Sequence, residues 1–149
     1  MNYTEEISKK LNNLLIKNYD AEKGYLNAID NIEDNRLKMF FKRRVSERSA
    51  FADELRTEIL RYGEFPENDG SIKGVVHRNW ATLKSAMSSN NEETILEETI
   101  RGEKASLEEY NNILKDRNLP PSIDALLYKH KNAIQASINT EKSYKEMVS

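Results

Sequence analysis

Four long stretches of this sequence repeat apolar residues every three or four positions, and few helix-breaking residues interrupt them. Only 5 of the 149 residues are glycine and 3 are proline, while 32% are charged. Apolar residues at this spacing are typical of amphipathic helices that bury one face and expose the other to water. No stretch shows a competing strand pattern. The sequence therefore predicts an all-α chain.

The first two long helices are predicted over residues 4–31 and from a cap at Asp34 to Gly63. An aspartate is a favoured N-terminal cap, and a glycine commonly ends a helix. The intervening connection, IEDN, is short. A connection of this length predicts that the two helices form an antiparallel hairpin.

The second half of the chain predicts another hairpin, after a long connection. The turn-rich segment GEFPENDGSIKG leads to a short helix expected near residues 72–88, which Asn90 and Asn91 close. A third long helix ends before Pro120, and a fourth begins near Ser122. Two hairpins joined by a long crossover predict a ferritin-like four-helix bundle, with residues 1–149 as a single domain.

Charge balance and cysteine content narrow the classes of function. The chain has 23 Lys and Arg against 25 Asp and Glu, so its formal charge of -2 offers no field that attracts nucleic acid. The KRR run at 42–44 is interpreted as part of a mixed-charge helix face, with a binding patch as the alternative. The absence of cysteine excludes thiolate chemistry.

The N-terminus and the apolar runs bear on localisation. The first residues lack the basic and apolar regions of a leader, and no apolar run reaches membrane-spanning length. We therefore expect a cytoplasmic protein without a membrane span.

Four segments of the chain resemble a known family. They are DAEKGYLNAI, FKRRVSERSAFADEL, DGSIKGVVHRNWATLKSAM and ILEETIRGEKASLEEY. Together they resemble a bacterial ferritin-like four-helix-bundle family catalogued as a domain of unknown function, over roughly residues 8–145. The most specific part is the crossover G-S-x-x-G-x-x-H-R-x-W-x-x-L-K-S-A, from Gly70 to Ala86. The resemblance implies this fold and topology and no established reaction.

Three crossover residues, His77, Arg78 and Trp80, are a candidate site. A tryptophan normally buries a large area, so Trp80 is expected to anchor the crossover on the bundle while His77 and Arg78 cap or bridge. A binding site at these residues is the alternative.

Ferritin-like bundles raise the question of a metal site. Di-metal carboxylate bundles use a Glu from two helices and Glu-x-x-His from the other two. An internal repeat aligns Glu22 with Glu103, but it places Ala50 and Ile138 where the histidines would lie. If the chain binds metal, the candidate ligands are Glu22, Glu47 and Glu103. The expectation is that it holds no metal and no other cofactor.

The angular positions of charged residues around the predicted helices indicate a buried polar cluster. Glu22 and Glu103 fall near the centres of their apolar stripes, and so do Arg44 and Arg48 on the second helix. At least one of the glutamates is expected to pair with one of the arginines, because an unpaired buried carboxylate is costly. In the alternative, the arginines extend to solvent and the glutamates line a wet groove. His130 is predicted to be a hydrogen-bonded core histidine.

Two classes of function follow. The first is a non-catalytic ferritin-like bundle that acts through self-association or a protein partner, with a stress-related role as one option. The alternative is a degenerate or unusual di-metal carboxylate protein, either an oxidase or a metal store. The missing histidines favour the first class, so catalysis is not expected.

Overall fold

The computed structural model describes residues 2–68, 78–89 and 91–148, and these residues are helical apart from short connections. Five helices span them, with no strand in the described part: α1 Tyr3–Ile29, α2 Asn35–Arg61, α3 Arg78–Met87, α4 Glu92–Leu114 and α5 Pro121–Val148. The prediction of an all-α chain is confirmed. Within these residues, no helix is both long enough and apolar enough to cross a bilayer.

The α1–α2 hairpin follows the prediction closely. Asp34 caps α2, and its carboxylate accepts a hydrogen bond from the Leu37 N–H at 2.9 Å. Beyond the other end of α2, Gly63 has φ 75°, a left-handed conformation that glycine adopts without a Cβ penalty. These two residues set where α2 begins and how the chain leaves it.

Asn91 begins α4 rather than closing the helix before it, which corrects the expectation for this residue. Its side-chain oxygen accepts a hydrogen bond from the Thr94 N–H at 3.0 Å, as an N-cap does. At the other end of the hairpin, α5 starts at Pro121, since proline's fixed φ suits the first helical position. Asp116, in the α4–α5 connection, pairs with Lys10 of α1.

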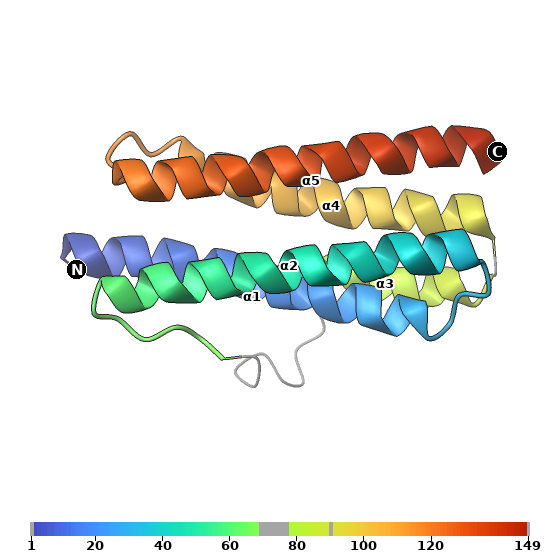
Figure 1. Ribbon diagram of the computed structural model, residues 1–149, viewed down its shortest axis with the longest axis horizontal. Helices are drawn as coiled ribbons and strands as arrows, with labels where there is room; N and C mark the ends of the chain where they lie inside the picture. Colours follow the sequence, from blue (N-terminus) through green and yellow to red (C-terminus); the bar gives the residue numbers. More distant parts are fainter. Residues whose placement is uncertain (1, 69–77, 90, 149) are drawn as a thin grey trace.

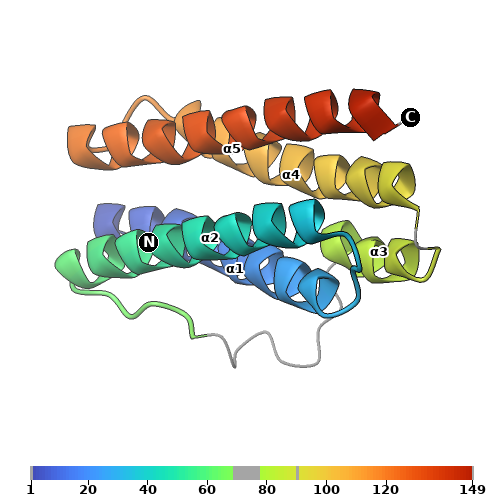
Figure 2. The same cartoon turned by 45° about the vertical axis from the view of Figure 1, so that its right-hand side comes forward.

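The two hairpins lie along each other, and Figures 1 and 2 show the α4–α5 pair as one layer and the α1–α2 pair as the other. The chain travels back along the molecule between α2 and α4, so these two helices run in the same direction (Figure 1). The short helix α3 packs against α1 and α4. It was predicted near residues 72–88, of which 72–77 lie outside the described residues.

Two apolar clusters form the core. One joins the N-terminal half of α1 to the C-terminal half of α2, and Leu11 and Leu55 are among its fully buried members. The other joins the opposite halves of the same helices to α3, and it includes Phe41 and Trp80. Buried polar residues, among them Arg48, lie where one cluster gives way to the other. Polar side chains of the core are thus gathered at one level of the bundle.

Candidate functional site

A buried ion pair between Arg48 of α2 and Glu103 of α4 lies at the centre of the polar level. Arg48 Nη2 donates to Glu103 Oε2 at 2.7 Å, and the two side chains are 0% and 1% exposed. Arg48 Nη1 donates to the Asn18 side-chain oxygen at 2.8 Å. Burial alone would lower the pKa of Arg48, but Glu103, Tyr25 and Tyr110 raise it, and the net shift is upward. The guanidinium therefore stays charged.

Tyr25 of α1 links this pair to a second carboxyl group, that of Glu141 on α5. The Tyr25 hydroxyl donates to Glu103 and lies 3.4 Å from Glu141 Oε1. Burial, and next the charge of Glu103, raise the pKa of Glu141 well above its ordinary value. Burial is also the largest cause of the strongly raised pKa of Tyr25. Burial therefore favours the protonated form of both groups, and Glu103 is the carboxylate that pairs with the Arg48 guanidinium.

A second branch runs from Asn18 toward the surface. Its amide donates to the Tyr110 hydroxyl at 3.0 Å, and that hydroxyl lies 2.7 Å from His130 Nδ1. His130 Nε2 lies 3.1 Å from Oε1 of Glu54, which is 32% exposed. Burial lowers the pKa of His130 to about 4, although Glu54 opposes the shift. A neutral imidazole can form both hydrogen bonds. Its Nε2–H donates to Glu54, and its Nδ1 accepts a hydrogen bond from the Tyr110 hydroxyl.

The network consists of side chains from all four long helices. Its members, in the order of their contacts, are Glu141, Tyr25, Glu103, Arg48, Asn18, Tyr110, His130 and Glu54. Two of its polar atoms, Arg48 Nε and Glu141 Oε2, are buried without a hydrogen-bond partner. The other polar groups of the network bond mainly to one another, and at its outer end Glu54 also pairs with Lys129 at 2.7 Å.

The structure separates the four residues of the predicted polar cluster. Arg48 and Glu103 are buried and paired, whereas Glu22 and Arg44 are only partly buried. Arg44 donates to Ser137 of α5 and lies 3.8 Å from Glu47 Oε1. The placement of Glu22 at a stripe centre is therefore corrected. One residue corresponds to about 100° of helix rotation, so Glu22 turns away from the fully buried Ala21 beside it.

Six of the eight network residues were absent from the predicted cluster, and Asn18 and Glu141 are two of them. Each continues an apolar stripe at helical spacing, Asn18 after Leu14 and Glu141 after Ile138. This spacing places both residues on the inward face of their helices, whereas the internal repeat that aligns Glu22 with Glu103 contains neither of them.

Among the crossover residues, the structure describes the side chain of Trp80. It is 7% exposed, and its ring centroid lies 4.9 Å from that of Tyr25. It also packs directly against Gly24 of α1. His77 lies outside the described residues, and so does the side chain of Arg78. Trp80 thus joins α3 to the helix that carries Tyr25.

The candidate metal ligands do not fit a two-metal centre. Glu103 already binds Tyr25 and Arg48 through its two oxygens, and a guanidinium beside it would repel a divalent cation. Glu47 lies at a partly exposed edge beside Arg44, and burial raises its pKa. No group of three or more His, Asp or Glu in the described residues has the arrangement of a metal site.

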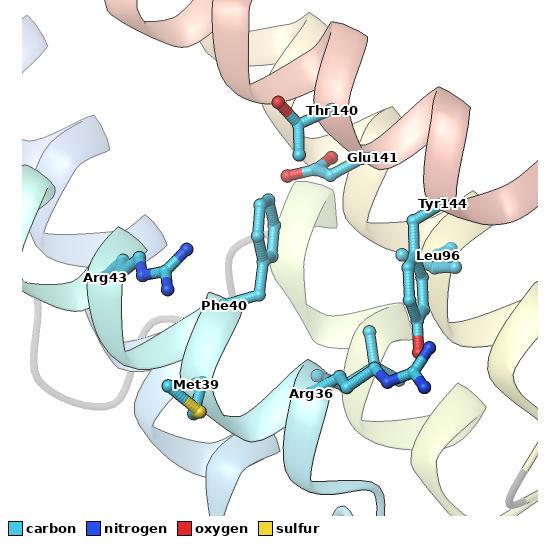
Figure 3. Close-up of a pocket in the computed structure, with 9 residues that line it drawn as sticks. Arg36, Met39, Phe40, Arg43, Leu96, Thr140, Glu141 and Tyr144 are labelled. Atoms are coloured by element: carbon cyan, nitrogen blue, oxygen red, sulfur yellow. The ribbon is translucent and has the colours of Figure 1, made fainter.

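A pocket of about 280 Å3 opens on the surface beside the network. Figure 3 shows its wall, which α2, α4 and α5 form from Arg36, Leu37, Met39, Phe40, Arg43, Leu96, Thr140, Glu141 and Tyr144. Most of the lining surface is apolar. Arg36 and Arg43 lie on either side of Phe40, and the Glu141 carboxyl group faces the ring of Phe40 (Figure 3). Glu141 therefore belongs to both the pocket and the buried network.

The two arginines of the pocket differ in their surroundings. Arg36 lies near the carboxylates of Asp34 and Glu92. The hydrogen bond from the Leu37 N–H is the main cause of the lowered pKa of Asp34, whereas burial and next Asp34 raise the pKa of Glu92 against the charge of Arg36. Arg43 is exposed and makes no hydrogen bond or ion pair with another residue in the described part of the chain. Arg43 is thus a positive group at the edge of an apolar pocket, with its hydrogen-bond donors open to a ligand.

Fold and site together define an all-α protein of two long hairpins with an internally paired polar core and an adjoining surface pocket. The family described as a domain of unknown function, DUF2383, matches residues 6–116. This match covers more than half of the chain, so the chain belongs to that family. The match ends before α5, which supplies Glu141 and His130. No curated protein matches the chain significantly.

Proposed function

We propose that the protein is a ferritin-like four-helix bundle that acts without catalysis, by associating with itself or with a protein partner through the pocket between α2 and α5. The pocket is the observation that carries this proposal. It combines apolar side chains with exposed guanidinium groups, a composition that suits a protein contact. The common direction of α2 and α4 supports the ferritin-like topology, because it requires the long crossover of that fold (Figure 1).

The buried network supports a structural role for the polar core. Arg48, Glu103 and Tyr25 engage one another rather than a cavity. A substrate would have to break these bonds to reach the three side chains. That would cost several kcal/mol, because a buried charge would lose its partner. The alternative, a di-metal oxidase or metal store, needs the same carboxylates free. Metal analysis after iron or manganese loading tests that alternative, and two equivalents of tightly bound metal would support it.

A photo-crosslinking amino acid at position 39 tests the proposal in cells that make the protein. Met39 is 58% exposed and lines the pocket, so the substitution leaves the fold intact. The matched control carries the same group at Leu26, an exposed apolar residue of α1. We expect position 39 to yield a discrete product, either with a second copy or with one other protein. Equal labelling at both positions would contradict a role for the pocket.

A further inference from the structure

An exposed phenylalanine at the far end of α2 has the chemistry that the pocket is suited to bind. Phe65 is 87% exposed, the highest value among the large apolar side chains described. It is flanked by Glu64 and followed, after Pro66, by Glu67. An aromatic ring between two carboxylates complements an apolar pocket between two guanidinium groups.

The backbone around Phe65 is held in place while its ring is exposed. The Phe65 carbonyl accepts a hydrogen bond from the Asn12 amide at 3.2 Å, and the Glu67 N–H donates to the Asn12 side-chain oxygen at 2.8 Å. The Tyr19 hydroxyl also donates to the Glu67 carbonyl at 3.1 Å. A side chain presented on a fixed backbone loses little conformational entropy on binding. The Phe65 ring can therefore enter an apolar pocket at a low entropic cost.

Glu64 and Glu67 on one surface and Arg43 on the other are open to pairing. Neither the Glu64 nor the Glu67 carboxylate forms an ion pair with another described residue. Across the molecule, Arg43 is likewise open at the edge of the pocket. Opposite charges that have no partner within one chain can pair between two chains without breaking an existing bond.

Phe65 cannot enter the pocket of its own chain. Arg43 and Tyr62 are separated by 19 positions on and just beyond α2, which corresponds to roughly 30 Å of helix. The segment is also tied to α1 by its hydrogen bonds to Asn12. Only another copy can bring a Phe65 ring to the pocket.

We propose that the segment Glu64–Glu67 of one copy inserts Phe65 into the α2/α5 pocket of a second copy, with Glu64 and Glu67 facing Arg36 and Arg43. This inference rests on the proposed function and names the partner. The contact joins two different surfaces, so an antiparallel pair closes with two such contacts, and a head-to-tail series adds further copies.

Sedimentation velocity of the full chain over a concentration series tests this contact. Phe65→Ala removes the ring and Arg43→Glu reverses the charge at the pocket, and both sites are exposed, so the fold is kept. We expect each variant to weaken association at least roughly tenfold, as for a central interface residue. Leu26→Ala and Lys42→Glu are the matched controls, because they are exposed and lie outside both surfaces, and they should associate like the wild type.

Mixing the two variants gives the sharper test. A Phe65→Ala chain keeps an intact pocket, and an Arg43→Glu chain keeps an intact Phe65. One contact between the two variants is therefore possible, although neither chain forms it well alone. With one variant fluorescently labelled, we expect a mixed complex to appear. Loss of association in both variants without a mixed complex would overturn the complementary contact.

Two further results separate this inference from the proposed function. If Arg43→Glu weakens self-association but Phe65→Ala does not, the pocket binds another segment and only the inference fails. If the wild type is monomeric throughout while position 39 crosslinks to a different protein, the inference also fails and the proposed function stands. If neither self-association nor crosslinking involves the pocket, both fail.

Discussion

Arg48 Nη2 lies 2.7 Å from Glu103 Oε2, deep between α2 and α4. The pair bridges the two hairpins at the level where the two apolar clusters meet. Tyr25 and Asn18 of α1 bind its outer atoms, so one ion pair fixes the relative position of three helices. A buried charge pair of this kind contributes specificity of packing, and its loss leaves a charge without compensation.

Arg48→Met should lower the free energy of unfolding by about 3 to 5 kcal/mol, because Glu103 is then buried without its cation. Replacing both residues, as Arg48→Met with Glu103→Leu, should recover much of that loss. Urea denaturation of the two single variants and the double variant measures the coupling. The partly exposed pair of Lys145 and Glu97 is the control, and Lys145→Met should cost less than about 1 kcal/mol. Additive losses at Arg48 and Glu103 would contradict the coupling.

Glu141→Gln should stabilise the protein increasingly as the pH rises. Glu141 has a raised pKa in the folded state, so the folded state keeps a proton that the unfolded state loses above its ordinary pKa. The free energy of unfolding therefore falls as the pH rises from the ordinary glutamate pKa toward the raised pKa of Glu141. Glutamine does not titrate, so the Gln variant avoids that loss. We expect a gain of roughly 1 to 3 kcal/mol at pH 8 and almost none at pH 4. Urea denaturation at several pH values measures it, and a pH-independent difference would disprove the assignment.

His130 should make the fold sensitive to acid. Its pKa is about 4 in the folded state against an ordinary 6.5, so the unfolded state binds more protons between these values. Its contribution to stability is complete above pH 6.5 and is lost as the pH falls toward 4. Over this range it should amount to roughly 2 to 3 kcal/mol. His130→Gln should flatten the dependence of unfolding free energy on pH there, and an unchanged slope would point to another group.

Gly24→Ala should destabilise the contact between α1 and α3. A Cβ at position 24 would lie 2.8 Å from Trp80 Cε3 and 3.1 Å from its Cβ, too close for a rigid indole to yield. Alanine would gain about 0.5 to 1 kcal/mol of helix propensity, but overpacking costs about 1 to 3 kcal/mol. The expected net effect is a loss of roughly 1 kcal/mol.

The fluorescence of Trp80 reports this change directly, because it is the only tryptophan. We expect its emission to shift to longer wavelength as the ring moves toward water. A Gly24→Ala variant that combines unchanged emission with higher stability would show that the two helices separate without strain.

Much of the helical framework could be predicted from local chemistry. Asp34 caps α2, as its sequence position indicated, and apolar spacing placed α1 within two residues of its observed ends. Asn91 was assigned to the wrong helix because asparagine is suited to both helix ends, and the sequence pattern does not state which neighbour it will bond.

The sequence by itself determined the helices, their amphipathic faces and the presence of charged residues on those faces, since these depend on contacts within about one helical turn. Only the tertiary structure decided which of those charges meet. Arg44 and Arg48 are 40° apart on α2, yet one reaches Ser137 near the edge and the other is buried against Glu103. Asn18 joins the network because α1 packs against α2 and α4, which bring Arg48 and Tyr110 to its amide group. Glu141 of α5 joins it through Tyr25, which lies 116 positions away in the sequence. The physical reason is that helix phase is set locally, whereas the partner of a buried polar group depends on the rotation and axial offset of whole helices.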